Sequence, residues 1–146
     1  SRNRNGVVAL ASEGSWLASP KIFEKNGFYK LDSRGRYDMM VYFYKETSLP
    51  KFLSWKDSKI LKQDLTLSYS NQCPANLKSI NEIKAFCEKE NIKIDYHEFQ
   101  DAKEAQKAPT GYGVYNLTRN NKILADHYIS LTRFKNIMKE EKLLEA

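Results

Sequence analysis

The 146-residue chain contains only two cysteines, Cys73 and Cys87, and only two histidines, His97 and His127. Two thiols are too few for the disulfide framework of a small secreted domain, so they indicate a reducing compartment, the cytoplasm. No Cys-x-x-Cys or His-x-x-x-His pair supplies the spacing that a zinc site needs. We therefore expect no metal.

Apolar runs long enough to cross a membrane are absent, and the N-terminus has no signal-peptide pattern. We therefore expect no membrane partner. The chain opens at Ser1 without an initiator methionine, which suggests a fragment of a longer protein.

Charge of one sign is not concentrated anywhere, although the formal net charge is +6. Interleaved signs are typical of solvated faces, whereas nucleic-acid binding needs a basic stripe that follows the phosphates. Nucleic acid is therefore not an expected partner, while a small anionic ligand stays compatible. Hydrophobic residues make up 41% of the chain, enough for a packed core.

The first third of the chain is predicted to fold as strand, helix, strand, strand. Gly6–Ala11 is a continuous apolar run, which indicates a central strand buried on both faces. Ser19 is a candidate N-cap with Pro20 at the first helical position, and Gly27 closes the helix. The expected elements are a strand over 6–11, a helix between Ser19 and Gly27, and strands over 28–31 and 37–44.

Residues 49–64 are predicted to be a connector with few apolar anchors, because Pro50 is followed by a stretch rich in Lys and Ser. The alternation from Leu65 to Tyr69 then begins a second unit. Its expected elements are a strand over 65–69, a helix over 74–90, a strand over 92–96, a short helix opened by Asp101 and Glu104, a hairpin over 113–129, and a last helix from Ser130.

The segment Lys21-Ile22-Phe23-Glu24-Lys25-Asn26-Gly27-Phe28 resembles a signature of the GNAT acetyltransferases, in which a helix ends on glycine and an aromatic residue anchors the next strand. The resemblance implies a cofactor, acetyl-CoA, and an acceptor, a small-molecule or peptide amine. It also implies that Val8, Ala9, Leu10 and Trp16 lie on the cleft side toward the cofactor, although Trp16 is also a candidate for filling the core.

Two departures from the GNAT pattern concern catalysis. The family usually has a tyrosine at the position of Phe23, where the hydroxyl serves as general acid, and phenylalanine has no proton to give. The Gly-rich loop that holds the pyrophosphate at a helix N-terminus is also missing from this sequence. We therefore expect the chain alone to bind acetyl-CoA negligibly and to be inactive.

The second unit resembles a thioredoxin or glutaredoxin fold, and in particular the YoaP-like domain that follows some bacterial GNAT domains. Cys73-Pro74 after a strand matches the redox-site position, and Pro109 matches the cis-proline of the family. Asn76 stands where a dithiol enzyme has its second cysteine. The resemblance therefore implies a thioredoxin-like site of Cys73, Pro74, Asn76 and Pro109 without two-cysteine chemistry.

The two cysteines are predicted to differ. Cys73 would lie at a helix N-terminus, where the dipole and the free amides favour a thiolate, so it is the candidate reactive thiol. Cys87 would lie on the apolar face of the same helix, and a helix of that length separates the two by roughly 20 Å, too far for a disulfide.

The sequence therefore predicts an α/β (α+β) chain: the C-terminal part of a GNAT domain (1–48, β-α-β-β), a connector (49–64) and a thioredoxin-like domain (65–146, β-α-β-α-β-β-α). The function implied is acetyl transfer to an amine. Two alternatives stay open: a monothiol redox or thiol-sensing protein that uses Cys73, and a non-catalytic binding module. Because the strand over 6–11 would lack upstream neighbours, association into a homo-oligomer through residues 1–48 is also expected.

Overall fold

A computed structural model describes residues 4–14 and 16–145. The described residues form two compact units, one ending at Leu53 and the other beginning at Ser54. Two sheets and four α-helices confirm the mixed α/β class. No helix in the described part of the chain is long and apolar enough to cross a membrane.

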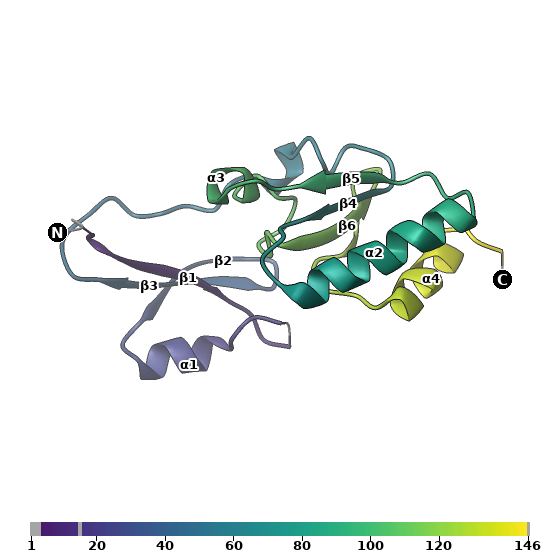
Figure 1. The fold of residues 1–146 in the computed structure, drawn as a ribbon. Helices are drawn as coiled ribbons and strands as arrows, with labels where there is room; N and C mark the ends of the chain where they lie inside the picture. Colours follow the sequence, from purple (N-terminus) through teal and green to yellow (C-terminus); the bar gives the residue numbers. More distant parts are fainter. Residues whose placement is uncertain (1–3, 15, 146) are drawn as a thin grey trace. The chain divides into compact units, whose positions relative to one another are not determined.

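The first unit is a three-stranded antiparallel sheet with one helix, in the predicted order (Figure 1). The strand order is β1-β3-β2, so β1 pairs with β3 along one edge only, with Val8 opposite Val41. The elements are β1 (Gly6–Ala11), α1 (Pro20–Lys25), β2 (Tyr29–Arg34) and β3 (Tyr37–Phe43).

The prediction that β1 is buried on both faces is wrong. The side chains of Val7 and Val8 are 41% and 48% exposed, and Ala11 is the only fully buried residue among the six. The cause is the position of β1 at the edge of a three-stranded sheet, which leaves its outer side without a neighbouring strand. The buried residues lie instead on the central strand β3, where Met40 and Val41 are both inaccessible to solvent.

Helix α1 begins and ends as its sequence predicts. The hydroxyl of Ser19 accepts from the Lys21 amide, and Pro20 occupies the first turn, where its missing N–H costs nothing. At the other end Gly27 adopts φ +82°, and the Phe28 amide donates to the Phe23 carbonyl at 3.1 Å. This arrangement is a Schellman motif, and a left-handed residue at that position favours glycine.

The second unit has a four-stranded sheet in the order β5-β4-β6-β7. Strand β4 pairs with β5 in parallel and with β6 antiparallel, and β6 forms a hairpin with β7. The hairpin turns at Asn120 and Asn121, both with positive φ, as a two-residue turn requires. The elements are β4 (Thr66–Tyr69), α2 (Pro74–Lys89), β5 (Asp95–Glu98), α3 (Ala102–Ala105), β6 (Tyr115–Arg119), β7 (Lys122–Ala125) and α4 (Leu131–Glu140).

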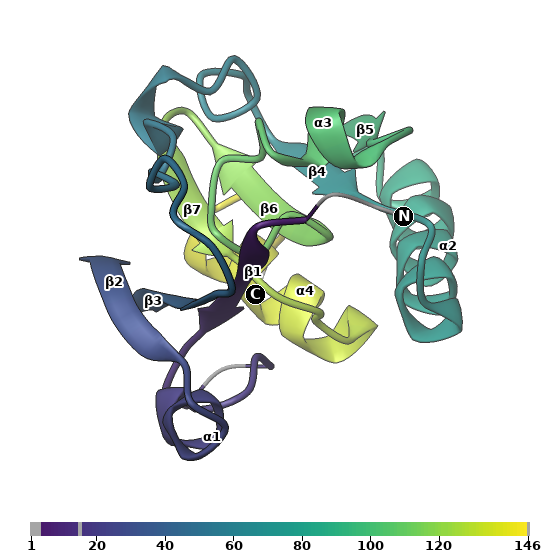
Figure 2. The ribbon, with the colours of Figure 1, turned by 90° about the vertical axis from the view of Figure 1, so that its left-hand side faces the viewer.

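Helices α2 and α4 cover one face of this sheet and form the main core with it (Figure 1 and Figure 2). Ile80 and Ile83 of α2 and Phe134 and Met138 of α4 are inaccessible to solvent, whereas Leu77 on α2 is 43% exposed. Each helix therefore buries one apolar face, and Leu77 lies outside it.

The opposite face of the sheet carries polar side chains that are nevertheless buried. Thr66 and Ser68 of β4 and Asn116 and Thr118 of β6 are all inaccessible to solvent. They alternate with Leu67 and Leu117, which point to the helices, because successive side chains of a strand lie on opposite faces.

Residues 54–64 are better anchored than the predicted connector. They include a 3-10 turn at Trp55–Asp57, and Ile60 packs in a small cluster with Phe99 and Ala108. The amides of Asn120 and Asn121 donate to the carbonyls of Gln63 and Leu61 at 2.8 Å. The segment therefore packs against the sheet and hairpin of the second unit.

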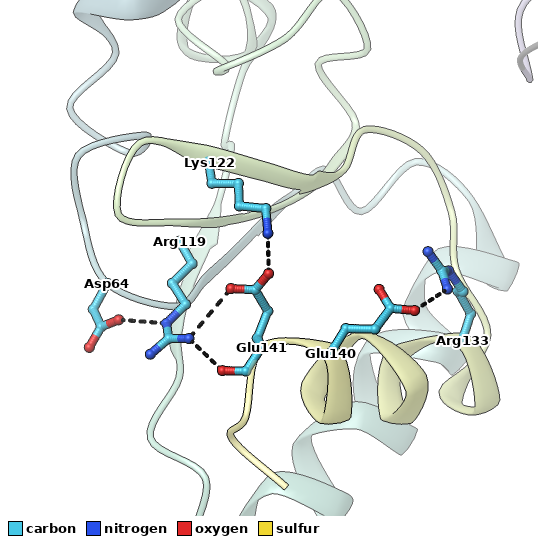
Figure 3. Close-up of polar contacts among 6 residues, drawn as sticks. All are labelled: Asp64, Arg119, Lys122, Arg133, Glu140 and Glu141. Carbon is cyan, nitrogen blue, oxygen red and sulfur yellow. Dashed lines mark hydrogen bonds and ion pairs between the residues drawn. The ribbon is translucent and has the colours of Figure 1, made fainter.

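A polar network joins the β6–β7 hairpin to the end of α4 (Figure 3). The Glu141 carboxylate accepts from Lys122 and lies 3.5 Å from the Arg119 guanidinium, which also lies 3.5 Å from Asp64. Arg119 in addition donates to the Glu141 carbonyl at 3.0 Å. Lys122 and Arg119 hold the pKa of the Glu141 carboxyl below its usual value of 4.5.

Candidate functional site

Three of the cleft-side candidates of the first unit lie on the edge strand β1, and the fourth lies in the loop that follows it. Val8 is exposed, Ala9 and Leu10 are half-buried, and Trp16 lies in the loop between β1 and α1 with 63% of its surface exposed. The alternative that Trp16 fills the core is therefore wrong. Val8 and Leu10 share one face of the strand while Ala9 lies on the other, so the structure brings these candidates to one edge and not to one surface.

Phe23 has a structural role that explains an aromatic residue at its position. It stands at the third residue from the end of α1, and its ring contacts Phe28 edge-to-face with 5.5 Å between ring centroids. A hydrophobic contact between these two positions commonly accompanies a Schellman motif. Phe23 therefore stabilises the helix end and has no group that exchanges a proton.

The N-terminus of α1 does not form a site for the pyrophosphate of coenzyme A. Helix α1 spans only six residues, and the hydroxyl of its N-cap, Ser19, donates to the carboxylate of Glu13 at 2.8 Å. An anion at this helix end would therefore meet a carboxylate. The edge of β1 that faces away from β3 pairs with no other strand among the described residues, so its backbone groups can pair with an extended ligand.

Cys73 occupies the predicted place at the start of α2. It is the N-cap residue, with an extended backbone (φ −134°, ψ 126°), and Pro74 follows at the first helical position. The thiol is exposed and makes no capping hydrogen bond, while the Cys73 carbonyl accepts from the Leu77 amide. The structure thus presents Cys73 to solvent at the positive end of a 16-residue helix.

Asn76 lies one turn into α2 and is turned inward. Only 4% of its surface is exposed, and its amide donates to the Val114 carbonyl at 3.5 Å. The position that holds a second cysteine in a dithiol motif therefore serves here to join α2 to the loop before β6.

Tyr112 is a neighbour of Cys73 that the sequence interpretation missed. Burial, and next the charge of Cys73, raise the pKa of the Tyr112 phenol, so hydroxyl and thiol lie within electrostatic range. A signal was present in the sequence, since Tyr112 stands between Gly111 and Gly113 in a loop. An added Cβ on Gly113 would lie 2.9 Å from the Ala105 carbonyl oxygen, so the loop packs too closely against α3 for a larger residue.

A buried pair of side chains fixes the loop that carries Tyr112. The Thr110 hydroxyl donates to the Asn116 side-chain oxygen, and the Asn116 amide donates to the Tyr112 carbonyl at 3.0 Å. The Tyr112 amide in turn donates to the Thr110 hydroxyl at 3.1 Å. Both side chains are at least 95% buried, so the loop geometry is set by fully enclosed hydrogen bonds.

The match of Pro109 to a cis-proline is wrong. No cis peptide bond occurs among the residues that the structure describes. Pro109 is buried in a bend that ends several residues before β6, and the Thr110–Asn116 hydrogen bonds shape the chain there. The trans isomer is intrinsically favoured by about 0.5–1 kcal/mol, and it is retained here.

Cys87 is a core residue, as predicted. It is 2% exposed on the inner face of α2, near the buried hydroxyl of Tyr96 on β5. Burial raises the pKa of the Cys87 thiol, and burial also raises the pKa of Tyr96. Both groups therefore stay protonated at neutral pH.

The histidines lie apart in carboxylate pairs. His97 lies 3.2 Å from Glu104 of α3, and His127 lies 3.0 Å from Asp126 after β7. Across residues 4–14 and 16–145, no group of three or more potential ligands is arranged to hold a metal ion.

No model of a known protein family matches the chain, and no solved structure matches it. A curated protein of Bacillus subtilis (strain 168), named "Uncharacterized N-acetyltransferase YoaP", is 22% identical over 139 residues. The chain is a distant relative of an N-acetyltransferase. The match covers 92% of this chain, and so extends over both units, but only 55% of YoaP. The chain thus spans about half the length of this relative.

Proposed function

We propose that the chain forms part of a GNAT-type N-acetyltransferase that transfers an acetyl group from acetyl-CoA to a small-molecule or peptide amine. The observation that carries the proposal is the similarity to YoaP over nearly the whole chain. The order β1-α1-β2-β3 and the helix end at Gly27 and Phe28 agree with the GNAT signature.

In this proposal residues 1–48 supply the closing part of the acetyltransferase domain. The free edge of β1 would bind the extended arm of the cofactor through its backbone, and the pyrophosphate would be held by residues outside this chain. Because Phe23 is apolar, the proton for the departing thiolate would come from water or from another residue. The protein would act in the cytoplasm of a bacterium and without a metal.

We propose that residues 65–146 are a YoaP-like domain of thioredoxin type. The order β-α-β-α-β-β-α supports this assignment, as does a central β4 with one parallel and one antiparallel neighbour. Its role would be to shape access for the acceptor or to bind a partner. Asn76 at the position of a second cysteine, together with the trans Pro109, argues against a two-cysteine redox cycle.

A second candidate function uses Cys73 as a monothiol redox or sensing group. The observation that favours it is the exposed thiol at the N-terminus of α2, with the Tyr112 phenol nearby. A non-catalytic binding module is the remaining alternative, and it requires neither the thiol nor acetyl-CoA.

For the chain 1–146 alone, in which no cofactor occupies this edge, we further propose that the free edge of β1 pairs with a second copy of the chain. Its sequence contains no charge and no proline, the features that normally protect an edge strand from association. Val7 and Val8 would be covered in such a homo-oligomer.

The proposal is tested on the protein expressed from its complete coding sequence, by following release of free CoA thiol from acetyl-CoA with a panel of amines. We expect amine-dependent turnover, and a much weaker reaction when Val8 on β1 is replaced by proline. The chain 1–146 alone should show no thermal stabilisation by acetyl-CoA. Absence of amine-dependent turnover in the complete protein would reject acetyl transfer and leave the thiol or the binding function.

A further inference from the structure

A polar cleft of about 170 Å³ lies at the carboxyl ends of the parallel strands β4 and β5. Residues 70–72, which connect β4 to α2, form one wall, and residues 98–102, which connect β5 to α3, form the other. We call this hollow the β4/β5 cleft. Its volume equals that of roughly five or six water molecules, so it accepts only a small ligand or the end of a larger one.

The side chains of the β4/β5 cleft carry negative charge and no positive charge. Glu98 and Asp101 contribute carboxylates, the remaining polar residues are amides and a hydroxyl, and no Lys, Arg or His is among the lining residues. One oxygen of Glu98 accepts from the Asn71 amide at 3.0 Å, across the two walls. One oxygen of Asp101 accepts from the Glu104 amide as the cap of α3. Each carboxylate thus keeps a second oxygen available.

A hydroxyl that lines the β4/β5 cleft has no hydrogen-bond partner among the described residues. Ser70 is 3% exposed and its backbone amide donates to the Val114 carbonyl, but its hydroxyl forms no hydrogen bond with any residue the structure describes. Although the residue as a whole is nearly enclosed, its hydroxyl oxygen is not, so it is open to water or to a ligand in the cleft. The Ser70 hydroxyl therefore offers a donor and an acceptor to an occupant of the cleft.

We propose that the β4/β5 cleft binds a primary ammonium group of a small aliphatic amine. An ammonium has three donors and no acceptor, which matches the free oxygens of Glu98 and Asp101 together with the Ser70 hydroxyl. The charge-assisted hydrogen bonds to the carboxylates supply most of the affinity. The site lies where ligands of open α/β sheets bind, outside the carboxyl ends of parallel strands. This proposal concerns binding of the amine alone and does not depend on acetyl transfer.

The test is an NMR titration of the ¹⁵N-labelled chain at pH 7 and constant ionic strength. The probe is 1,4-diaminobutane, with 1,4-butanediol as the neutral analogue and succinate as the anionic analogue of similar length. Because the chain carries a net charge of +6, general attraction of a dication is not expected. We expect saturable shifts confined to the amides of 70–72 and 98–102 with the diamine only.

Substitutions separate this site from other acidic surfaces. Glu98→Gln keeps an oxygen that accepts from Asn71 but removes the charge, and it should weaken diamine binding at least about tenfold. Glu82→Gln is the matched control, because Glu82 lies on α2 outside the cleft, 3.9 Å from Lys78, and should leave binding unchanged. Equal effects of the two variants, equal shifts with butanediol, or shifts spread over the chain would overturn the proposal. Failure of acetyl transfer in the complete protein would not overturn the proposal that the β4/β5 cleft binds an amine.

Discussion

The Tyr115 hydroxyl of β6 lies 3.0 Å from the Ser79 hydroxyl of α2, and Ser79 donates its only proton to the Ile129 carbonyl at 2.7 Å. Tyr115 must therefore be the donor to Ser79, since a serine has one hydroxyl proton. These two hydrogen bonds join the sheet, α2 and the segment before α4 inside the core. Burial raises the pKa of Tyr115 to about 12.

This chain of hydrogen bonds gives a prediction for stability. Tyr115→Phe should lower the free energy of unfolding by about 1 kcal/mol, the net value of one hydrogen bond. Ser79→Ala should cost more, about 2–3 kcal/mol, because it leaves both the Tyr115 hydroxyl and the Ile129 carbonyl buried without a partner. Urea unfolding of the two variants and the wild type measures both values. A smaller cost for Ser79→Ala than for Tyr115→Phe would contradict the direction assigned to these bonds.

Tyr115 also predicts a pH dependence at the alkaline end. Its folded pKa is raised above the value of about 10 expected in the unfolded chain, so its contribution is present in full below pH 10. That contribution is lost as the pH rises from about 10 to 12. The stability difference between wild type and Tyr115→Phe, measured by urea unfolding from pH 8 to 11.5, should therefore shrink above pH 10. A constant difference would show that the phenol ionises alike in both states.

Glu141 predicts the opposite behaviour in acid. Its folded pKa is lowered, so the stabilisation is present above the unfolded value, near 4.5, and is lost as the pH falls through the folded pKa. Glu141→Gln should reduce stability at pH 7 by about 1 kcal/mol and flatten the loss below pH 4.5. Glu140→Gln is the control, because Glu140 is 61% exposed and pairs only with Arg133 among the contacts in Figure 3. Equal effects of the two variants would mean that the Glu141 network contributes nothing.

The two thiols should differ strongly in reactivity. Cys73 is exposed at the start of α2, whereas Cys87 is buried with a raised pKa, so iodoacetamide should modify Cys73 many-fold faster at pH 7.5. Mass spectrometry of peptides after timed quenching gives both rates, and Cys73→Ser should abolish the fast phase. Equally slow labelling of both residues would remove the basis for a thiol function.

Trypsin should first cut the chain after β3, in the last residues of the first unit. Lys45 and Lys51 lie in a stretch without helix or strand, whereas Lys59 and Lys62 flank the buried Ile60 and Leu61. Brief digestion should therefore give cleavage at Lys45 or Lys51 before any other site. Early cleavage at Lys59, Lys62 or within 77–88 would show that the second unit is less stable than its packing implies.

Association through β1 is tested by light scattering. Val8→Lys places a charge on the free edge and should reduce the mass of the associated species. Ile22→Lys makes the same change at an exposed site on α1 and should leave association unaffected. A wild-type chain that stays monomeric at high concentration would refute pairing between copies.

Local signals in the sequence predicted most elements of the fold. The caps Ser19, Asp101 and Ser130 each accept a backbone hydrogen bond at the start of their helices, as predicted. The strand expected over 92–96 begins later, at Asp95, because Asn91 adopts φ +53° and the Ile92 amide still closes the end of α2 by donating to the Cys87 carbonyl. Ile92 and Ile94 are apolar because they pack against the core, and not because they belong to a paired strand.

The candidate site was less predictable, because it depends on contacts between distant segments. The position of Cys73 follows from the local strand, turn and Cys-Pro sequence. The proximity of Tyr112 does not, since it depends on a loop fixed by the buried Thr110–Asn116 pair. The exposure of Val8 likewise depends on the number of strands beside β1, which composition does not encode.

The central place of β4 has a consequence for the order of folding. During synthesis β4 leaves the ribosome before both of its partners, and its pairing with β6, Thr66 opposite Thr118, must close a long loop. The β6–β7 hairpin closes through only two residues and can form first. Before β5 and β6 pair with it, β4 is an unpaired strand. Thr66 and Ser68 make one of its two faces polar. The residues that form a buried polar layer in the folded unit thus also keep the nascent strand from being a fully apolar target for aggregation.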